Sequence, residues 1–302
     1  MLKHFYTIIL LGSLALLFSC QQQDNISTKL FPNPPDTNSF GKFANKLTAN
    51  EKAWLVADTT YTREGKLRNI GIQEVPQDKD DFRNFGFDGG LLNRKYLRDV
   101  DFRGAYFRSA KAMHSDFSYS DFRWANLESA RFYASKLFAC NFTQAVMFYF
   151  FADSARMDSS LFISANMFGM HANDASMRYC NFSNAMLRDA DYINTDFTGS
   201  IAVKSILTHS IFIDSKMDSM DLSYVIGSHS TFKGASFVNS RLWHADFSET
   251  NLDSANFYGA DLKNCNFNGA NFRNTNFKNA INIPANVKAK LVDDKISGIL
   301  GN

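Results

Sequence analysis

The fold is decided by the stretch Ala255-Asn256-Phe257-Tyr258-Gly259-Ala260-Asp261-Leu262-Lys263-Asn264-Cys265-Asn266-Phe267-Asn268-Gly269-Ala270-Asn271-Phe272-Arg273-Asn274. It repeats every five residues as small, polar, large apolar, variable and variable, and the register holds without an insertion from Val100 to Asn279. A period of five fits neither the helical period of about 3.6 nor the two-residue period of a strand. It fits a chain that turns a corner every five residues, so that four corners close a rung of twenty.

The register is strict. Of the 36 central positions from Phe102 to Phe277, 31 carry Phe, Leu, Met or Tyr. Two residues earlier, 31 of 36 positions carry Ala, Ser, Thr or Cys. Where the small position carries a bulkier residue, the central position often carries a smaller one. The summed volume of the two side chains then stays nearly constant, as a close-packed interior demands. Both positions should therefore point into one core. The compensated pairs are Phe150 with Ala152, Met170 with Ala172, and Val225 with Gly227.

These residues resemble the pentapeptide-repeat family, whose repeat is Ala-Asp/Asn-Leu/Phe-X-X, over about three fifths of the chain. The resemblance implies an all-β fold, a right-handed four-sided β-helix in which neighbouring rungs pair at about 4.8 Å. Stacked rungs predict inner ladders, one of which begins Phe102, Phe122, Phe142. The Asn and Asp residues before the central positions should bond nearby backbone at the corners.

The first residues predict export and a lipid anchor. An apolar run from Ile8 to Phe18 is too short to span a bilayer and is typical of a signal peptide. It ends Leu17-Phe18-Ser19-Cys20, which resembles a bacterial lipobox and makes Cys20 the expected acylated N-terminus. An ordinary cleavage site with a chance Cys is the alternative. Gln21 follows Cys20, and the absence of Asp there favours the outer membrane by the enteric sorting rule.

Five segments follow from these patterns. We expect a signal peptide over 1–19, a flexible tether over 20–45, an N-terminal cap over 46–81, a β-helix over 82–280 and a C-terminal cap over 281–302. The N-terminal cap should be a short β-hairpin turning at Gly65, and the coil should start irregularly between Phe82 and Leu97. Pro284 should open a short helix that buries Val287, Leu291 and Ile296 and covers the last rung.

Charge and cysteine usage narrow the function. The chain has 32 basic and 30 acidic residues, so its net charge is close to zero. Some pentapeptide-repeat proteins mimic duplex DNA with a strongly acidic rod, which this composition does not provide. The sequence also shows no cluster of positive charge of the kind that binds nucleic acids. Cys140, Cys180 and Cys265 occupy small inward positions. Cys140 and Cys180 lie two rungs apart, about 10 Å, too far for a disulfide. We expect three small core residues.

No GxSxG, HExxH, Walker or GxGxxG motif occurs, so we expect a non-enzyme without a cofactor. One column of outward residues at twenty-residue steps carries side chains that could bind a metal or act in catalysis. It contains Asp189, His209, His229 and Glu249, with His244 one corner away. A metal-binding or enzymatic role at the His209/His229 column is an alternative, but we favour a solvated charge ladder, because nothing in the pattern buries the site or supports the histidines.

The outer rows predict a binding surface. Positions on either side of the central residue should point outward, and on one face they are apolar over several rungs, whereas the face with Asp116, Lys136 and Arg156 is polar. A contiguous apolar patch indicates a partner more often than scattered residues do. We therefore expect a lipid-anchored scaffold of the bacterial cell envelope that binds a protein, with a passive spacer as the alternative. In some relatives the C-terminal end also forms a homodimer. The candidate surface consists of Val146, Phe148, Tyr149, Phe151, Phe168, Met186, Ile206 and Ile226.

Overall fold

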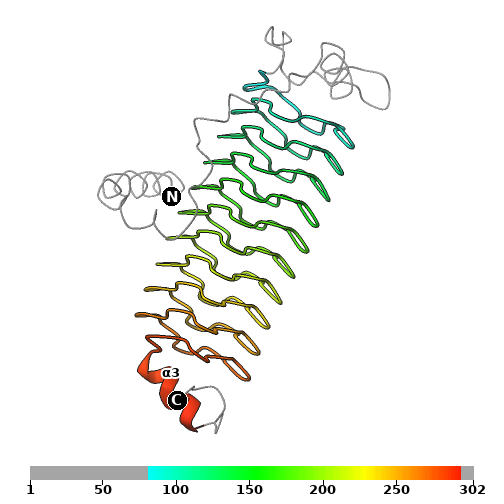
Figure 1. The fold of residues 1–302 in the computed structure, drawn as a ribbon. Coiled ribbons are helices and arrows are strands. Elements are labelled where there is room, and N and C mark those ends of the chain that lie inside the picture. Colours follow the sequence, from blue (N-terminus) through cyan, green and yellow to red (C-terminus); the bar gives the residue numbers. More distant parts are fainter. Residues whose placement is uncertain (1–80, 294–302) are drawn as a thin grey trace, which may run out of the picture. The chain divides into compact units, whose positions relative to one another are not determined.

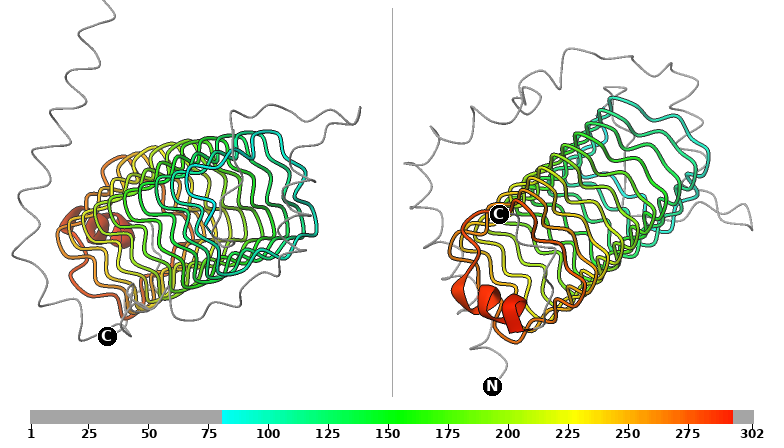
Figure 2. Two further views of the ribbon diagram at one scale, coloured as in Figure 1. Left: turned by 90° about the horizontal axis from the view of Figure 1, so that it is seen from above. Right: turned by 60° about the horizontal axis from the view of Figure 1, so that its bottom comes forward.

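The structure is a computed structural model that describes residues 81–293. From Asp81 to Asp261 every fifth residue forms a single parallel bridge to the residue twenty positions further on, the last of them to Ile281. The rungs stack as a coil in Figure 1, and Figure 2 shows them as four-sided loops of similar size. The predicted twenty-residue rung is confirmed, because each bridge joins residues i and i+20.

The four sides of the coil are four narrow parallel sheets. Each contains one column of bridged residues at twenty-residue steps, called its bridging column, and we number the faces by these columns. Each face also contains the residue two positions after each bridging residue. Face 1 bridges from Asp81 to Ile281, face 2 from Gly86 to Asn266, face 3 from Leu91 to Asn271, and face 4 from Tyr96 to Asn276. Faces 2 and 4 lie on opposite sides of the rung, because two corners separate them.

The interior is filled by the predicted ladders. Phe102, Phe122, Phe142, Phe162 and Phe182 are fully buried and stack with ring centroids 4.9–5.0 Å apart. Burying each such side chain contributes about 1.5–3 kcal/mol before the entropy cost. The compensated pairs are confirmed too, since Phe150 and Ala152 are both fully buried. A filled interior leaves only the outer faces for binding.

Each corner is a tight turn whose third residue has a positive φ. Gly occupies this position at Gly169 (φ 64°), but most corners use other residues, such as Tyr149 (φ 50°). In most corners the N–H of the fourth residue donates to the carbonyl of the first, as Ala105 does to Phe102 at 3.0 Å. This is the type II geometry, which costs a non-glycine residue on the order of 1 kcal/mol. The cost is offset because the corner N–H bonds to the next rung, for example Asn84 to the Arg103 carbonyl at 2.9 Å.

Some corners are open, and a serine from the next rung closes them. At the corner from Leu187 to Ala190, the Ser210 hydroxyl accepts from the Ala190 N–H (3.1 Å) and donates to the Leu187 carbonyl (2.6 Å). At these positions Ser rather than Ala is present because its hydroxyl serves the corner twenty residues earlier. The serines that accept in this way are Ser115, Ser120, Ser135, Ser160, Ser200, Ser210, Ser230 and Ser240.

The start of the described coil differs from the prediction, and its end carries the predicted helix after Pro284. The expected irregular start was wrong, because the corner pattern is regular from Asp81 and Phe85 is buried against Phe82, with ring centroids 5.2 Å apart. A bulky residue at a small position is accommodated there by edge-to-face packing. At the other end, the helix α3 (Ala285–Asp293) follows Pro284, and Val287 is fully buried. It contacts the coil where the Asn286 amide donates to Asn268 at 3.2 Å. The side chains of Leu291 and Ile296 lie outside the described residues.

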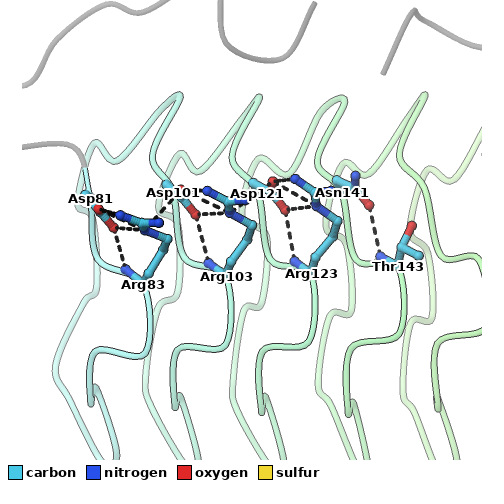
Figure 3. A network of polar contacts seen from close by, with 8 residues as sticks. All are labelled: Asp81, Arg83, Asp101, Arg103, Asp121, Arg123, Asn141 and Thr143. Atoms are coloured by element: carbon cyan, nitrogen blue, oxygen red, sulfur yellow. Dashed lines mark hydrogen bonds and ion pairs between the residues drawn. The ribbon is translucent and has the colours of Figure 1, made fainter. Parts of the chain in front are cut away.

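Face 1 begins with three repeats of one ion pair (Figure 3). Asp101 accepts both the backbone N–H and the guanidinium of Arg103, and Asp121 does the same for Arg123. The backbone bond two residues along confirms the role predicted for these Asp and Asn residues. Each pair is partly exposed, so its contribution is on the order of 0.2–1 kcal/mol. The series ends at Asn141, which keeps only the backbone bond to Thr143 (3.0 Å).

The predictions for residues 1–80, including acylation of Cys20, the tether and the β-hairpin, lie outside the described residues. Within residues 81–293, no helix is long and apolar enough to cross a membrane.

Candidate protein-binding surface

The predicted surface is centred on face 2. Val146, Met186, Ile206 and Ile226 belong to a single bridging column, interrupted by Asn166. Ile226 is 44% exposed, while the other three are partly buried. Bridged neighbours lie one rung apart, about 4.8 Å, so Met186, Ile206 and Ile226 form an uninterrupted apolar strip along the coil, with Val146 beyond Asn166. We call the eight predicted residues the apolar wall.

Three aromatic side chains widen this strip at one point. The rings of Phe148 and Phe168 lie 6.2 Å apart on successive rungs of face 2, and the Tyr149 ring meets Phe168 edge to face at 5.7 Å. Tyr149 is half exposed and lies over Gly169, where an added Cβ would come within 2.6 Å of its ring. Gly169 thus lets the Tyr149 ring lie flat along the corner.

Phe151 lies around that corner, in the bridging column of face 3. Its ring stacks on His171 with centroids 5.1 Å apart and planes 9° apart. The His171 ring is in turn 3.1 Å from the Asp191 carboxylate. The structure therefore brings seven of the eight wall residues onto face 2 and its corner, and places Phe151 on the adjoining face.

Further apolar residues occupy the same rungs on faces 1 and 3, which the sequence prediction missed. They are Ile163, Ile201 and Val203 on face 1, and Ile193, Ile211 and Ile213 on face 3, all partly exposed. Reading every outer row at twenty-residue steps, rather than two of them, would have found them. Face 4 is polar at these rungs, with Ser176, Asp196 and Lys216 in its bridging column. The predicted contrast between the apolar and polar faces is confirmed.

The histidine column has a geometry that favours stacking over metal binding. The His209 and His229 rings are parallel, with centroids 5.2 Å apart and planes 5° apart. Parallel rings direct their nitrogens side by side rather than at one point. The flanking carboxylates are engaged elsewhere, since Asp189 accepts from Arg188 at 2.9 Å and Glu249 folds over Gly269. Among residues 81–293, no three His, Cys, Asp or Glu side chains are grouped as metal ligands.

The model of the family described as pentapeptide repeats matches this chain in eight copies, over residues 96–128, 114–144, 165–201, 230–269 and 255–281. The chain belongs to the pentapeptide-repeat family. Its matched segments all lie within the coil, and a search of curated proteins found no relative of this pentapeptide-repeat protein.

The solved structure of one pentapeptide-repeat protein, HetL, supports the fold. HetL, a pentapeptide repeat protein involved in heterocyst differentiation regulation from the cyanobacterium Nostoc sp. strain PCC 7120, is 21% identical, with a TM-score of 0.66 over 68% of this chain and 92% of HetL. Full-length QnrB1, a plasmid-mediated fluoroquinolone resistance protein, is 19% identical, with a TM-score of 0.32 over 68% of this chain and 99% of QnrB1. At these identities the likeness shows the fold alone, which is the right-handed four-sided β-helix of pentapeptide-repeat proteins.

The cysteines of this pentapeptide-repeat coil take the place of serines. The thiols of Cys140, Cys180 and Cys265 are unoxidised and buried, and each donates to a carbonyl one rung back, at 3.1, 3.1 and 2.7 Å. Burial raises the pKa of the Cys265 thiol to about 12, and it raises the pKa of the other two thiols further. A buried protonated thiol is a poor nucleophile and a poor metal ligand, which fits the predicted structural role.

Proposed function

We propose that this protein is a lipid-anchored, non-enzymatic scaffold of the bacterial envelope, whose apolar wall binds a protein. The observation that carries the proposal is the apolar strip on face 2 from Met186 to Ile226, which Phe148 and Phe168 extend on the two rungs before it. A strip of apolar side chains on successive rungs is more typical of an interface than of a solvated surface. Because the interior is packed with side chains, a partner has only the outer faces to contact.

The mechanism is rigid display. Every rung is bonded to its neighbours through its backbone, so the wall is ordered before a partner arrives. Binding then orders few further groups on the scaffold side, and this lowers the entropic cost of association. Exposed aromatic residues such as Tyr149 and partly exposed ones such as Phe148 would be the anchors, since interface energy concentrates in large, rigid side chains. The lipid on Cys20 would hold this surface at the membrane, in the outer membrane by the sorting rule.

The experiment is affinity capture from crosslinked native membranes with the wild-type chain and a Phe148→Glu/Phe168→Glu variant. The matched control is Val238→Glu/Tyr258→Glu, which places the same charges at the same repeat position on successive rungs of face 4. We expect a protein that the wild type and the control retain and the wall variant loses. If all three captures are identical while all variants keep their β-sheet circular dichroism, the wall is not an interface and a passive spacer is the better interpretation.

The lipid anchor has its own test. Palmitate labelling of the expressed protein should be lost in a Cys20→Ser variant and retained in a Cys140→Ser variant. Labelling that survives in Cys20→Ser would remove the anchor and, with it, the proposed location.

A further inference from the structure

Face 4 carries a shallow hollow that is separate from the apolar wall. Its volume is about 360 Å³, at the lower end of the range of about 300–1,000 Å³ that is typical of small-ligand pockets. It spans the rungs from Arg98 to Asp158, whereas most of the wall lies on face 2, on the opposite side, and begins on the last of these rungs. The lining residues that matter here are Arg98, Asp116, Lys136, Phe138, Arg156 and Asp158.

Two cations in the hollow lack partners. Lys136 and Arg156 are bridged neighbours on successive rungs, and both are exposed. Among residues 81–293, neither side chain makes a hydrogen bond or an ion pair, although Asp116 occupies the adjoining bridging position. Their backbones lie one rung apart, about 4.8 Å, and two neighbouring positive groups of this kind favour an anionic group between them.

Two carboxylates flank these cations, and each is held in place through one oxygen. Asp116 Oδ1 accepts from the Ser118 N–H at 3.0 Å. Asp158 Oδ1 accepts from the Arg178 N–H at 3.0 Å and from the Ser176 hydroxyl. The Oδ2 atom of each carboxylate takes no part in these bonds. It is thus a fixed acceptor for a ligand that brings hydroxyl donors.

The hollow also has an apolar surface. The Phe138 ring is 39% exposed and meets Tyr119 edge to face at 5.5 Å. Arg98 lies over the Tyr119 ring at 5.1 Å, and its buried Nε has no hydrogen-bond partner, because Asp116 Oδ1 is 4.0 Å away. A ligand that fits must therefore combine a flat apolar side with an anionic group.

We propose that this hollow binds an acidic saccharide, a sugar chain that carries carboxylates. Its carboxylate lies between Lys136 and Arg156, its hydroxyls donate to Asp116 and Asp158, and the C–H face of a ring packs on Phe138. The hollow is open, so the outward face of the ligand must remain hydrated, and a sugar ring satisfies this.

Other ligand classes match fewer of these groups. A neutral sugar leaves both cations uncompensated, and a flat aromatic anion brings no donors for the carboxylates. An extended acidic peptide repeats its side chains on one side at about 6.6 Å, which does not match the rung spacing of about 4.8 Å.

The test is isothermal titration calorimetry of the full chain at about 0.15 M salt, where surface charge alone is largely screened. The probes are hexagalacturonate, the neutral sugar cellohexaose, and hexaglutamate. The variants are Lys136→Ala and Phe138→Ala. Their matched controls are Lys216→Ala and Val238→Ala, which lie on face 4 at the same repeat positions but outside the hollow. Phe138→Tyr keeps the ring and serves as the conservative variant.

We expect hexagalacturonate to bind, and each hollow variant to weaken binding about tenfold, because each loses one charge-assisted or apolar contact. The controls and Phe138→Tyr should bind as the wild type does, and cellohexaose should bind at least about tenfold more weakly. Absence of hexagalacturonate binding overturns the proposal. Equal binding of hexaglutamate, or binding that Phe138→Ala leaves unchanged, also overturns it, because charge alone would then explain the interaction.

Discussion

Replacing Ser210 by Ala tests whether serines hold the open corners of the coil. The hydroxyl of Ser210 is the partner of two backbone groups, the Ala190 N–H and the Leu187 carbonyl, and all three residues are at least 98% buried. A buried backbone group without a partner costs about 1–3 kcal/mol, so an open corner that leaves two such groups would lose about 2–6 kcal/mol. The corner can relax by forming its own bond from Ala190 to Leu187, which recovers part of this. We expect a net loss of about 2 kcal/mol.

Ser205→Ala is the matched control. Ser205 is also buried, but its hydroxyl donates to the Ala202 carbonyl (2.7 Å), which the Ser205 N–H already contacts at 3.1 Å. Its removal leaves that carbonyl bonded, so we expect a loss below about 1 kcal/mol. The assays are urea unfolding and amide hydrogen exchange at Ala190, whose protection should fall only in Ser210→Ala. Equal destabilisation by the two variants, with unchanged exchange at Ala190, would refute the reasoning.

Three further predictions concern buried or crowded groups. Tyr192 is fully buried, its hydroxyl has no hydrogen-bond partner, and burial raises its pKa. Removing this hydroxyl in Tyr192→Phe should therefore raise the free energy of unfolding by about 1–2 kcal/mol, and a lower urea midpoint would contradict this. The Cys265 pKa is raised from 9.0 to about 12, so the unfolded chain ionises first as pH rises and stability falls above pH 9. Between about pH 8 and pH 10, the wild type should therefore lose about 1.4 kcal/mol more than Cys265→Ser in urea unfolding, and an equal loss would argue against it. Gly169→Ala should lower the free energy of unfolding by about 1–2 kcal/mol, because the new Cβ meets the Tyr149 ring. The displaced ring should show shifted NMR signals, and unchanged ring signals would count against this packing.

The sequence predicted the coil well because its strongest signal is local. Each large central residue points inward and each small residue sits two positions earlier, so a five-residue window fixes the path of the chain. The stacking of Phe102 on Phe122 follows from that path and the rung length alone. The regular start at Phe85 was missed because edge-to-face packing depends on neighbours three and two residues away, which a rule of small residues does not contain.

Other features could not be predicted because they depend on contacts between rungs. Ser and Ala are equivalent as small residues in the five-residue pattern, and only the corner twenty residues earlier distinguishes Ser210 from Ser205. The hollow on face 4 depends on the directions of long side chains such as Lys136 and Arg156. The sequence does place these residues on a polar face, but it does not show which of them lack partners.

The serine-bridged corners also bear on how the chain avoids misfolding. Rungs with similar cores could stack with one rung skipped, because Phe would still meet Phe. Skipping a rung would, however, set the open corner at Cys140 against Cys180 instead of Ser160, and the open corner at Cys180 against Met220 instead of Ser200. Against Cys180 the Cys140 N–H would lose its hydroxyl acceptor, and against Met220 the corner at Cys180 would lose both donor and acceptor, at about 1–3 kcal/mol for each buried group left without a partner. The order of hydroxyls along the small positions therefore distinguishes otherwise similar rungs, and it allows a repetitive chain to close in a single alignment.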